Sequence, residues 1–456
     1  MKAGFFELDI TPRVGVGLCG FGPYVNRYSI GVRDVLKTRA AAFEQDGEKA
    51  INVSCDLIGV TPEIAQKVKQ LVEKQTGVPA GNIMVHCTHT HSGPNTGAYI
   101  GWGNEDDPYI VLLPGKIAKA CAGALGRLQE TEMLHAAVPC EGVGLNREYD
   151  KDAPPLEDVL RDDWRPAKPE LTDTKCHVLK FIHKTTGKMS GFMAYFGCHP
   201  VVCCRLTRYI HGDYCGVAMN NLERENPGAV GLFLQGAQGD VNSCVVHKPE
   251  KEALLALDII AARFANSVRH GLQTAKPLAV DNIKCADVMQ DFSSKEIPLS
   301  RIKEMLAEKE AIVYADGVSD ENETVRMAVV TVLTLRCIIS RIENGEDLLT
   351  QTAEIQGIRL GPVEFLSAPL EIMQAIKNEV VAAAKAPVTL VMGITNGSMG
   401  YAPDKTAAAR GGYAADVVPM IVGRMPFLDI HSELVQAFLE IDSILSNSDC
   451  TCSPEK

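Results

Sequence analysis

The chain has 456 residues, of which 46% are apolar and 22% are charged. This composition is typical of a folded protein and excludes wholesale disorder, and the length allows one or two large α/β units. The formal net charge is −12, from 45 Lys and Arg against 57 Asp and Glu. Because the chain has neither a basic excess nor a basic run, we expect no nucleic-acid partner.

The 15 cysteines bear on the cellular compartment. Their number is odd, so they cannot all pair within one chain. The N-terminus lacks the apolar stretch of a secretory signal, and the longest apolar window, 327–335, ends at Arg336. We therefore expect a cytoplasmic protein with no transmembrane segment, whose reduced thiols are mostly core residues. Nothing in the sequence indicates an oligomeric state.

Strand and helix patterns alternate through the first 275 residues. Apolar runs predict strands, and amphipathic runs bounded by capping residues predict helices. The predicted strands are 50–55, 82–87, 191–196 and 229–234, and the predicted helices are 62–76, 214–224 and 249–270. This alternation is typical of an α/β architecture with at least partly parallel strand pairing.

A second section begins near residue 276. It shows strand patterns at 279–288, 352–358 and 363–367 and helix patterns at 299–311 and 323–342. A stretch rich in Pro, Asp and Glu, 150–174, predicts a long surface connection. We therefore divide the chain into an α/β half that carries the histidine motifs (1–275), a second α/β half (276–445) and a flexible tail (446–456).

The strongest local motif is Val-His-Cys-Thr-His-Thr-His-Ser-Gly-Pro at 85–94, which closes a predicted strand. Residues two apart on a strand point to one face, so we expect His89 and His91 to be presented together. A His-x-His pair offers two imidazoles to one metal, or one ligand and a proton-handling neighbour. The alternative is a set of hydrogen-bonded, half-buried histidines.

The second motif is Cys-His-Pro at 198–200, again at the end of an apolar strand. Pro200 cannot continue the ladder, so we expect His199 at the mouth of the sheet as a further site member. Cys203 and Cys204 lie close by in sequence, but without a Cys-x-x-Cys pair they do not favour a structural zinc site.

Other polar residues follow strands but have ordinary explanations. Asp213 has the pattern of a helix N-cap, and Glu371 that of a carboxylate in the first turn of a helix. The Gly-rich turn 234–242 lacks the Lys and Ser/Thr of a phosphate loop, and we interpret it as a pocket wall. Tyr401 ends a turn, where it could simply pack.

Together these motifs resemble the N-terminal catalytic domain of the neutral/alkaline (non-lysosomal) ceramidase superfamily. The resemblance is carried by Asp-Ile-Thr-Pro at 9–12, His-Thr-His-Ser-Gly-Pro at 89–94, Asn-Arg at 146–147, Cys-His-Pro at 198–200, and Gly-Asp at 212–213 and 239–240. It continues to about Tyr401 and so covers most of the chain. We expect a mixed α/β (α+β) fold of layered sheets flanked by helices, without the family's C-terminal immunoglobulin-like domain.

The resemblance implies a zinc-dependent amidohydrolase. By motif, the Zn²⁺ ligands fall on His89, His199, Glu371 and Tyr401, which leaves room for an activated water. His91 becomes the neighbour that shuttles protons, and Arg147 resembles the family's substrate-anchoring Arg.

One departure concerns catalysis. Ceramidases carry a Ser three residues beyond the Gly that matches Gly239, and here that position is Asn242, with Ser243 out of register. Metal-activated water attacking the carbonyl directly is then the simpler mechanism, with Asn242 and nearby backbone N–H groups steadying the oxyanion.

The expected function is zinc-dependent hydrolysis of the amide bond of a small soluble substrate. The absence of a secretion signal and of the accessory domain favours such a substrate over a membrane lipid. The alternatives are an esterase or lactonase at the same zinc site, and a catalytically silent metal- or ligand-binding relative.

Overall fold

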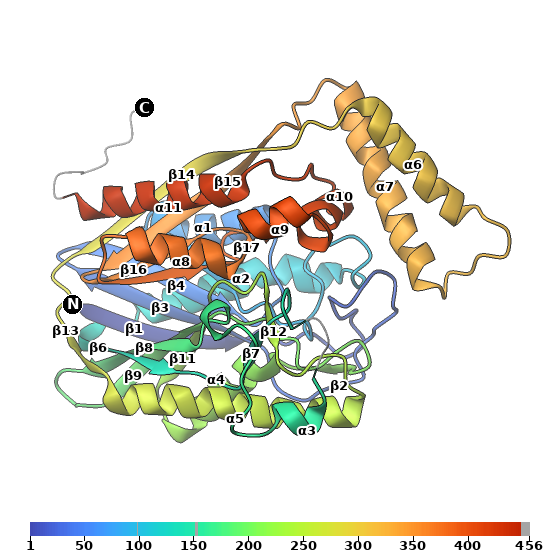
Figure 1. Ribbon diagram of the computed structural model, residues 1–456. Helices are drawn as coiled ribbons and strands as arrows, with labels where there is room; N and C mark the ends of the chain where they lie inside the picture. The colour runs from blue at the N-terminus through green and yellow to red at the C-terminus, as the bar shows by residue number, and fades with distance from the viewer. Residues whose placement is uncertain (98, 151–153, 448–456) are drawn as a thin grey trace.

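The computed structural model describes residues 1–97, 99–150 and 154–447 (Figure 1). Its largest sheet has nine strands in the order β11-β9-β8-β6-β1-β3-β4-β5, with β13 paired to β6. The strands are β1 (Lys2–Asp9), β3 (Lys37–Gln45), β4 (Glu48–Cys55), β5 (Ile83–Cys87), β6 (Gln129–Pro139), β8 (Lys175–His183), β9 (Met189–Phe196), β11 (Val230–Gln235) and β13 (Lys276–Leu278). The pairs β4–β5 and β9–β11, at the two ends of this order, are parallel, and the pairs between them are antiparallel.

The two halves of this sheet face each other. Phe43 of β3 and Phe181 of β8 pack with ring centroids 5.5 Å apart in a core shared by both halves. Ser54 Oγ of β4 donates to the Phe233 carbonyl of β11 across this core at 2.7 Å. The carboxyl ends of the two parallel strand pairs therefore lie close together, although they are at opposite ends of the strand order.

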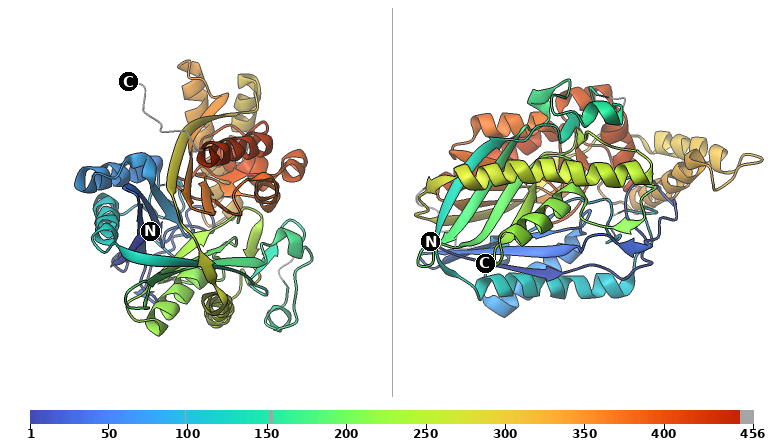
Figure 2. Two further views of the ribbon diagram at one scale, coloured as in Figure 1. Left: turned by 90° about the vertical axis from the view of Figure 1, so that its left-hand side faces the viewer. Right: turned by 90° about the horizontal axis from the view of Figure 1, so that it is seen from below.

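Helices cover the outer faces of the two halves (Figure 2). Helix α2 (Asp107–Leu125) packs on β1, β3 and β4, and α1 (Pro62–Thr76) packs on α2 and β5, around one core. Helices α4 (Asp213–Glu225) and α5 (Glu250–Thr274) pack on β6, β8 and β11 around another. The two halves of the sheet thus form the inner layers, and the two pairs of helices form the outer layers.

A second sheet has the order β14-β15-β16-β18. Its elements are β14 (Ile283–Ser293), β15 (Thr350–Leu360), β16 (Val363–Ser367) and β18 (Val388–Met392), with α8 (Gln374–Ala383) and α11 (Ile430–Ser446) packed together beside it. Ile358 and Phe365 from this sheet join the core that holds Phe43 and Phe181. Helices α6 (Leu299–Val313) and α7 (Glu323–Glu343) form a hairpin that projects from the body (Figure 1).

The mixed α/β class with several sheets and flanking helices is confirmed. Helix α1 begins after Thr61, whose side chain accepts from the Ile64 N–H, and ends at Gly77 in the left-handed region, as its capping signals predict. The predicted strand 279–288 is wrong in its bounds, because β14 begins at Ile283. The predicted tail 446–456 lies almost wholly outside the described residues, and the division at residue 275 stays a prediction.

The described cysteines form no disulfide, and all but Cys285 and Cys337 are buried. Among the described residues, no helix combines the length and the apolar character needed to cross a membrane.

Candidate metal centre

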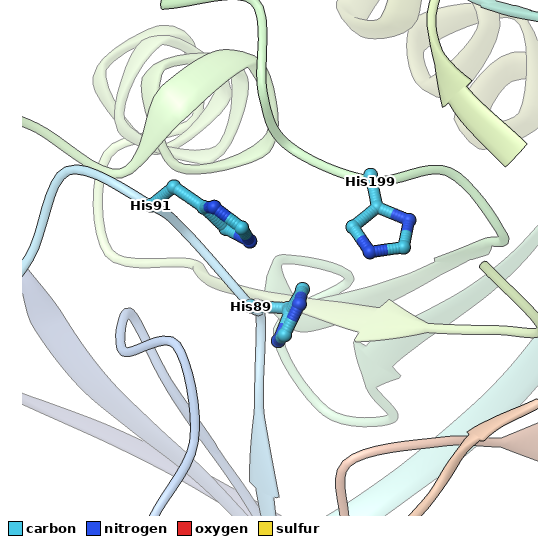
Figure 3. Close-up of side chains that lie close together, drawn as sticks. All are labelled: His89, His91 and His199. Atoms are coloured by element: carbon cyan, nitrogen blue, oxygen red, sulfur yellow. The ribbon is translucent and has the colours of Figure 1, made fainter. Parts of the chain in front are cut away.

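Three imidazoles converge where strands β5 and β9 end (Figure 3). His89 and His91 lie on the segment after β5, and His199 on the segment after β9. The ring centroid of His89 lies 4.9 Å from that of His91 and 5.0 Å from that of His199. One ring nitrogen from each histidine lies within 4.8 Å of the other two, which is a spacing that one metal ion can bridge.

The prediction that alternation along a strand presents His89 and His91 on one face is wrong. Strand β5 ends at Cys87, and His89 has φ 70°, in the left-handed region, so alternation along a strand does not apply to it. The segment is held by the His89 N–H donating to Leu57 O at 2.8 Å and by Thr90 Oγ donating to His211 O at 3.0 Å. A strained turn, rather than strand pleating, brings the two rings together.

Hydrogen bonds define which ring nitrogens of His89 and His199 carry protons. His89 Nδ1 lies 2.6 Å from the Ile58 carbonyl oxygen, and His199 Nδ1 lies 2.6 Å from that of Gln238. A carbonyl oxygen only accepts, so both Nδ1 atoms donate. In the neutral imidazoles both Nε2 atoms then present lone pairs, as metal ligands do.

Glu371 faces those two lone pairs. Its Oε2 lies 2.9 Å from His199 Nε2 and 3.7 Å from His89 Nε2. Burial opposes ionisation of Glu371, but His89, His199 and Arg147 outweigh it and lower its pKa to about 2. Burial lowers the pKa of His89 to about 4, so this imidazole is neutral near pH 7. In the neutral rings, two nitrogen lone pairs face one carboxylate, and this donor set fits a divalent cation such as Zn²⁺.

Tyr401 is placed by its strand pairing with Glu371. Strands β17 (Glu371–Ile372) and β19 (Tyr401–Ala402) are parallel, with Glu371 opposite Tyr401. The Tyr401 ring stacks on His199 at 6.4 Å between centroids, and its phenol is buried, which raises its pKa well above 10. The pairing of two short strands thus brings together two predicted ligands that are 30 residues apart in sequence.

A second pair of short strands positions Arg147, which follows one strand, and Asn242, which lies on the other. Strand β7 (Gly144–Asn146) pairs with β12 (Val241–Ser243), and Asn242 bridges to His199. Arg147 Nη2 donates to Gly239 O at 2.6 Å and Nη1 to Asn242 Oδ1 at 3.5 Å. Ser243 is fully buried, and its hydroxyl accepts from the Val245 N–H at 3.4 Å.

All of the predicted site residues line one cavity of about 560 Å³: His89, His91, Arg147, His199, Asn242, Glu371 and Tyr401. Ser243 is not part of the lining. Apolar side chains form much of the remaining wall: Phe21, Ile58, Trp102, Val246, Met327 and Ile421. Met327 belongs to α7, so the projecting hairpin contributes to this wall.

The predicted site residues thus lie together in one cavity. The family model for the N-terminal domain of neutral/alkaline non-lysosomal ceramidases matches residues 2–249. The chain belongs to this family.

The chain is also similar to individual ceramidases in sequence and in structure. The neutral ceramidase of Pseudomonas aeruginosa is 23% identical over 262 residues, which are 54% of this chain and 38% of that protein. The crystal structure of neutral ceramidase from Pseudomonas aeruginosa matches 100% of this chain and 76% of its own, with a TM-score of 0.73 at 17% identity. A ceramidase complexed with C2 matches 97% of this chain and 75% of its own, with a TM-score of 0.73 at 16% identity. At these identities, the structural matches establish the ceramidase fold.

Asp213 has a structural role in this ceramidase-family chain, different from the predicted N-cap. Gly212 is the N-cap of α4, and the Asp213 carboxylate accepts the N–H groups of Val202, Cys203 and Tyr214. Cys203, His211 and Asp213 cluster closely enough for a metal. However, His211 Nδ1 accepts from the Asp213 N–H, so Nε2 of the neutral ring carries the proton, and this set is a poor metal site.

Arg27 is a site residue that the sequence did not indicate. Its buried guanidinium donates to His91 O at 2.5 Å, to Ser92 Oγ at 3.2 Å and to Thr207 O at 3.0 Å. It also lies 5.1 Å from the ring centroid of Phe21, whose ring is 5.1 Å from that of His91. A lone Arg in a Gly-rich segment has no sequence signal for such a role.

Proposed function

We propose that this ceramidase-family chain is a zinc-dependent hydrolase of the amide bond of a small substrate with an apolar acyl group. The observation that carries the proposal is the convergence of His89 Nε2, His199 Nε2 and the Glu371 carboxylate in a buried cavity. His89, His199 and Glu371 would hold the metal, with Tyr401 as a fourth, weaker ligand. Bound there, Zn²⁺ would supply Lewis-acid polarisation of the carbonyl and a lowered pKa for water.

His91 is the proposed proton shuttle. Neither of its ring nitrogens has a hydrogen-bond partner among the described residues. Burial, together with His89, His199 and nearby arginines, lowers its pKa well below 6.5, so the ring is neutral. A neutral imidazole can accept a proton from the attacking water and return it to the leaving nitrogen.

Asn242 is proposed to steady the carbonyl oxygen as negative charge develops on it, while Arg147 anchors the substrate. Because Asn242 Oδ1 accepts from Arg147, the Asn242 Nδ2 hydrogens are left to donate to substrate. This contribution is of the oxyanion-hole type, and it needs no hydroxyl at the position of the family's serine.

The cavity supports the substrate class. Its volume of about 560 Å³ is within the usual range of small-molecule sites. The apolar wall favours an acyl chain, and the buried polar groups lie at the carbonyl end. The buried, unpaired thiols support a cytoplasmic location for such an enzyme.

The test combines metal analysis with turnover of N-octanoyl amides, comparing wild-type protein with His89→Ala. We expect about one zinc per chain in the wild type, and loss of both metal and turnover in the variant. His270→Ala, on the exposed side of α5, is the matched control and should keep both. Metal-free but active protein, or full turnover by His89→Ala, would contradict the proposal.

Two alternatives have their own signatures. An esterase or lactonase would use the same residues, and would cleave octanoyl esters or lactones in preference to the amides. A silent relative, suggested by Asn242 in place of the serine, would bind zinc but turn over none of these compounds.

A further inference from the structure

A second cavity adjoins the candidate metal centre. It has a volume of about 460 Å³, and Arg147 and Tyr413 line both cavities. The remaining lining comes from Glu148, from α9 (Lys405–Arg410) and from the segment that follows α9. Arg147 and Tyr413 are therefore the residues that lie between the metal centre and this space.

Glycines shape the floor of the second cavity. Gly411 and Gly412 link α9 to a single π-helical turn, η3 (Tyr413–Val417), and have φ values of 73° and 101°. Other residues rarely adopt this conformation. A Cβ at Gly412 would meet no atom within 4 Å, whereas one at Gly411 would lie 2.5 Å from Asp416 Oδ2, which accepts from the Gly412 N–H.

The second cavity differs from the first in charge. Its charged lining residues, within the described part of the chain, are Arg147, Arg410 and Glu148. Arg410 pairs with Glu148. Arg147 makes no ion pair among the described residues, and the oxygens of Gly239 and Asn242 that accept its hydrogen bonds are neutral. The lining thus carries two guanidinium groups against one carboxylate.

We propose that this second cavity is a carboxylate subsite, and that the substrate is an N-acyl amino acid. This inference rests on the proposed function and deepens it. The apolar acyl group lies in the first cavity, and the amino-acid carboxylate binds between Arg147 and Arg410, because guanidinium groups recognise carboxylates by paired N–H donors. An N-acyl amino acid is the simplest small amide that joins an apolar half to a carboxylate-bearing half.

Hydrolysis of this substrate balances without a co-reactant. Water adds its oxygen to the acyl carbon, the C–N bond breaks, and the amino-acid nitrogen gains the proton. The products are a fatty carboxylate and a free amino acid. Arg410 is a specificity residue in this scheme, since it meets the amino-acid half and not the bond that breaks.

The test compares N-octanoylglycine and N-octanoyl-β-alanine with the carboxamide of each. Binding is measured by calorimetry and turnover by release of the free amine, on the zinc-loaded protein. We expect at least one acid to bind at least about tenfold more tightly than its carboxamide, because the amide leaves a guanidinium unpaired. Equal affinity of acid and amide, or no binding of either, overturns the inference.

Variants of Arg410 test the residue itself. Arg410→Gln should reduce the acid-to-amide ratio of kcat/KM about tenfold, and Arg410→Lys should recover part of it. Arg336→Gln is the matched control, because Arg336 also pairs with a glutamate, Glu310, but lines neither cavity. An unchanged ratio in Arg410→Gln overturns the inference. Selective binding of the acid without cleavage would contradict the proposed hydrolysis and support the subsite.

Discussion

His199 Nε2 and Glu371 Oε2 lie 2.9 Å apart in the candidate metal centre. His199 Nδ1 donates to the Gln238 carbonyl oxygen, 2.6 Å away, so Nε2 of the neutral ring carries a lone pair. Glu371 stays ionised, because nearby His89, His199 and Arg147 lower its pKa against the effect of burial. With a neutral His199, a metal cation held by both atoms would satisfy this contact; a proton on His199 Nε2 is the alternative.

Replacing Glu371 by Gln should therefore weaken zinc binding. We expect at least a tenfold to hundredfold loss of affinity, since even outer-shell partners of a metal contribute about that much. Competition with a chromogenic chelator measures it. Glu379→Gln is the control, because Glu379 bonds His431 Nε2 at 2.8 Å in a similar pair, outside the cavity lining. Equal zinc affinity in Glu371→Gln and the control would contradict the ligand assignment.

His91→Ala should separate proton transfer from metal binding. We expect zinc content to stay near that of the wild type and kcat to fall by about 10²–10⁴, the usual contribution of a general acid–base group. Metal analysis and turnover are measured on the same preparation. His91 also lies within 4.8 Å of the His89 and His199 nitrogens, so loss of zinc in this variant would make it a ligand instead.

Asn242 and Ser243 provide a matched pair of variants on neighbouring residues. Asn242→Ala should lower kcat by about 10²–10³, as loss of one oxyanion donor does. Ser243→Ala should leave kcat near the wild-type value, because the Ser243 hydroxyl is buried and is not part of the cavity lining. A large loss of activity in Ser243→Ala would show that the serine acts despite its register.

The stability of the fold should depend on pH through Glu364. Burial and neighbouring Asp442 raise its pKa from 4.5 to about 8, and Arg359, 3.9 Å away, only partly offsets this. As the pH rises, this carboxyl ionises at a lower pH in the unfolded chain than in the folded protein. The contribution of its protonated form to stability is therefore fully present below pH 4.5 and is lost as the pH rises towards 8.

The effect of Glu364→Gln on the free energy of unfolding should then be more favourable at pH 8 than at pH 5. We expect a difference of about 1–3 kcal/mol in the free energy of unfolding, measured by urea denaturation at both pH values. The exposed Glu296→Gln is the control and should show no such difference. Destabilisation by Glu364→Gln that is equal at both pH values would contradict the raised pKa.

Elements with strong local signals could be predicted from the sequence. Thr61, Pro62 and Gly77 define the ends of α1, and the apolar run 363–367 is β16. Strand β3 was not predicted, because its central alanines do not alternate with polar residues. Helix α2 was not predicted either, and Pro114 within it is a helix-breaking signal.

The candidate site needed more than local signals. His89 and His199 meet because the two halves of the large sheet pack face to face, and Glu371 joins them from a distant part of the chain. No periodicity encodes these contacts. Only the family resemblance joined them in advance, because Glu371 and Tyr401 by themselves have ordinary explanations. Arg27, which is buried, and Arg410, which is exposed, were not predicted, since nothing in their local sequence distinguishes them from other arginines.

The most direct test of the account is the zinc dependence of amide hydrolysis by one purified preparation. We expect turnover of N-octanoylglycine to disappear when a chelator removes about one zinc per chain, and to return when one equivalent is restored. Turnover that persists in zinc-free protein would contradict the central claim that His89, His199 and Glu371 form a catalytic metal centre.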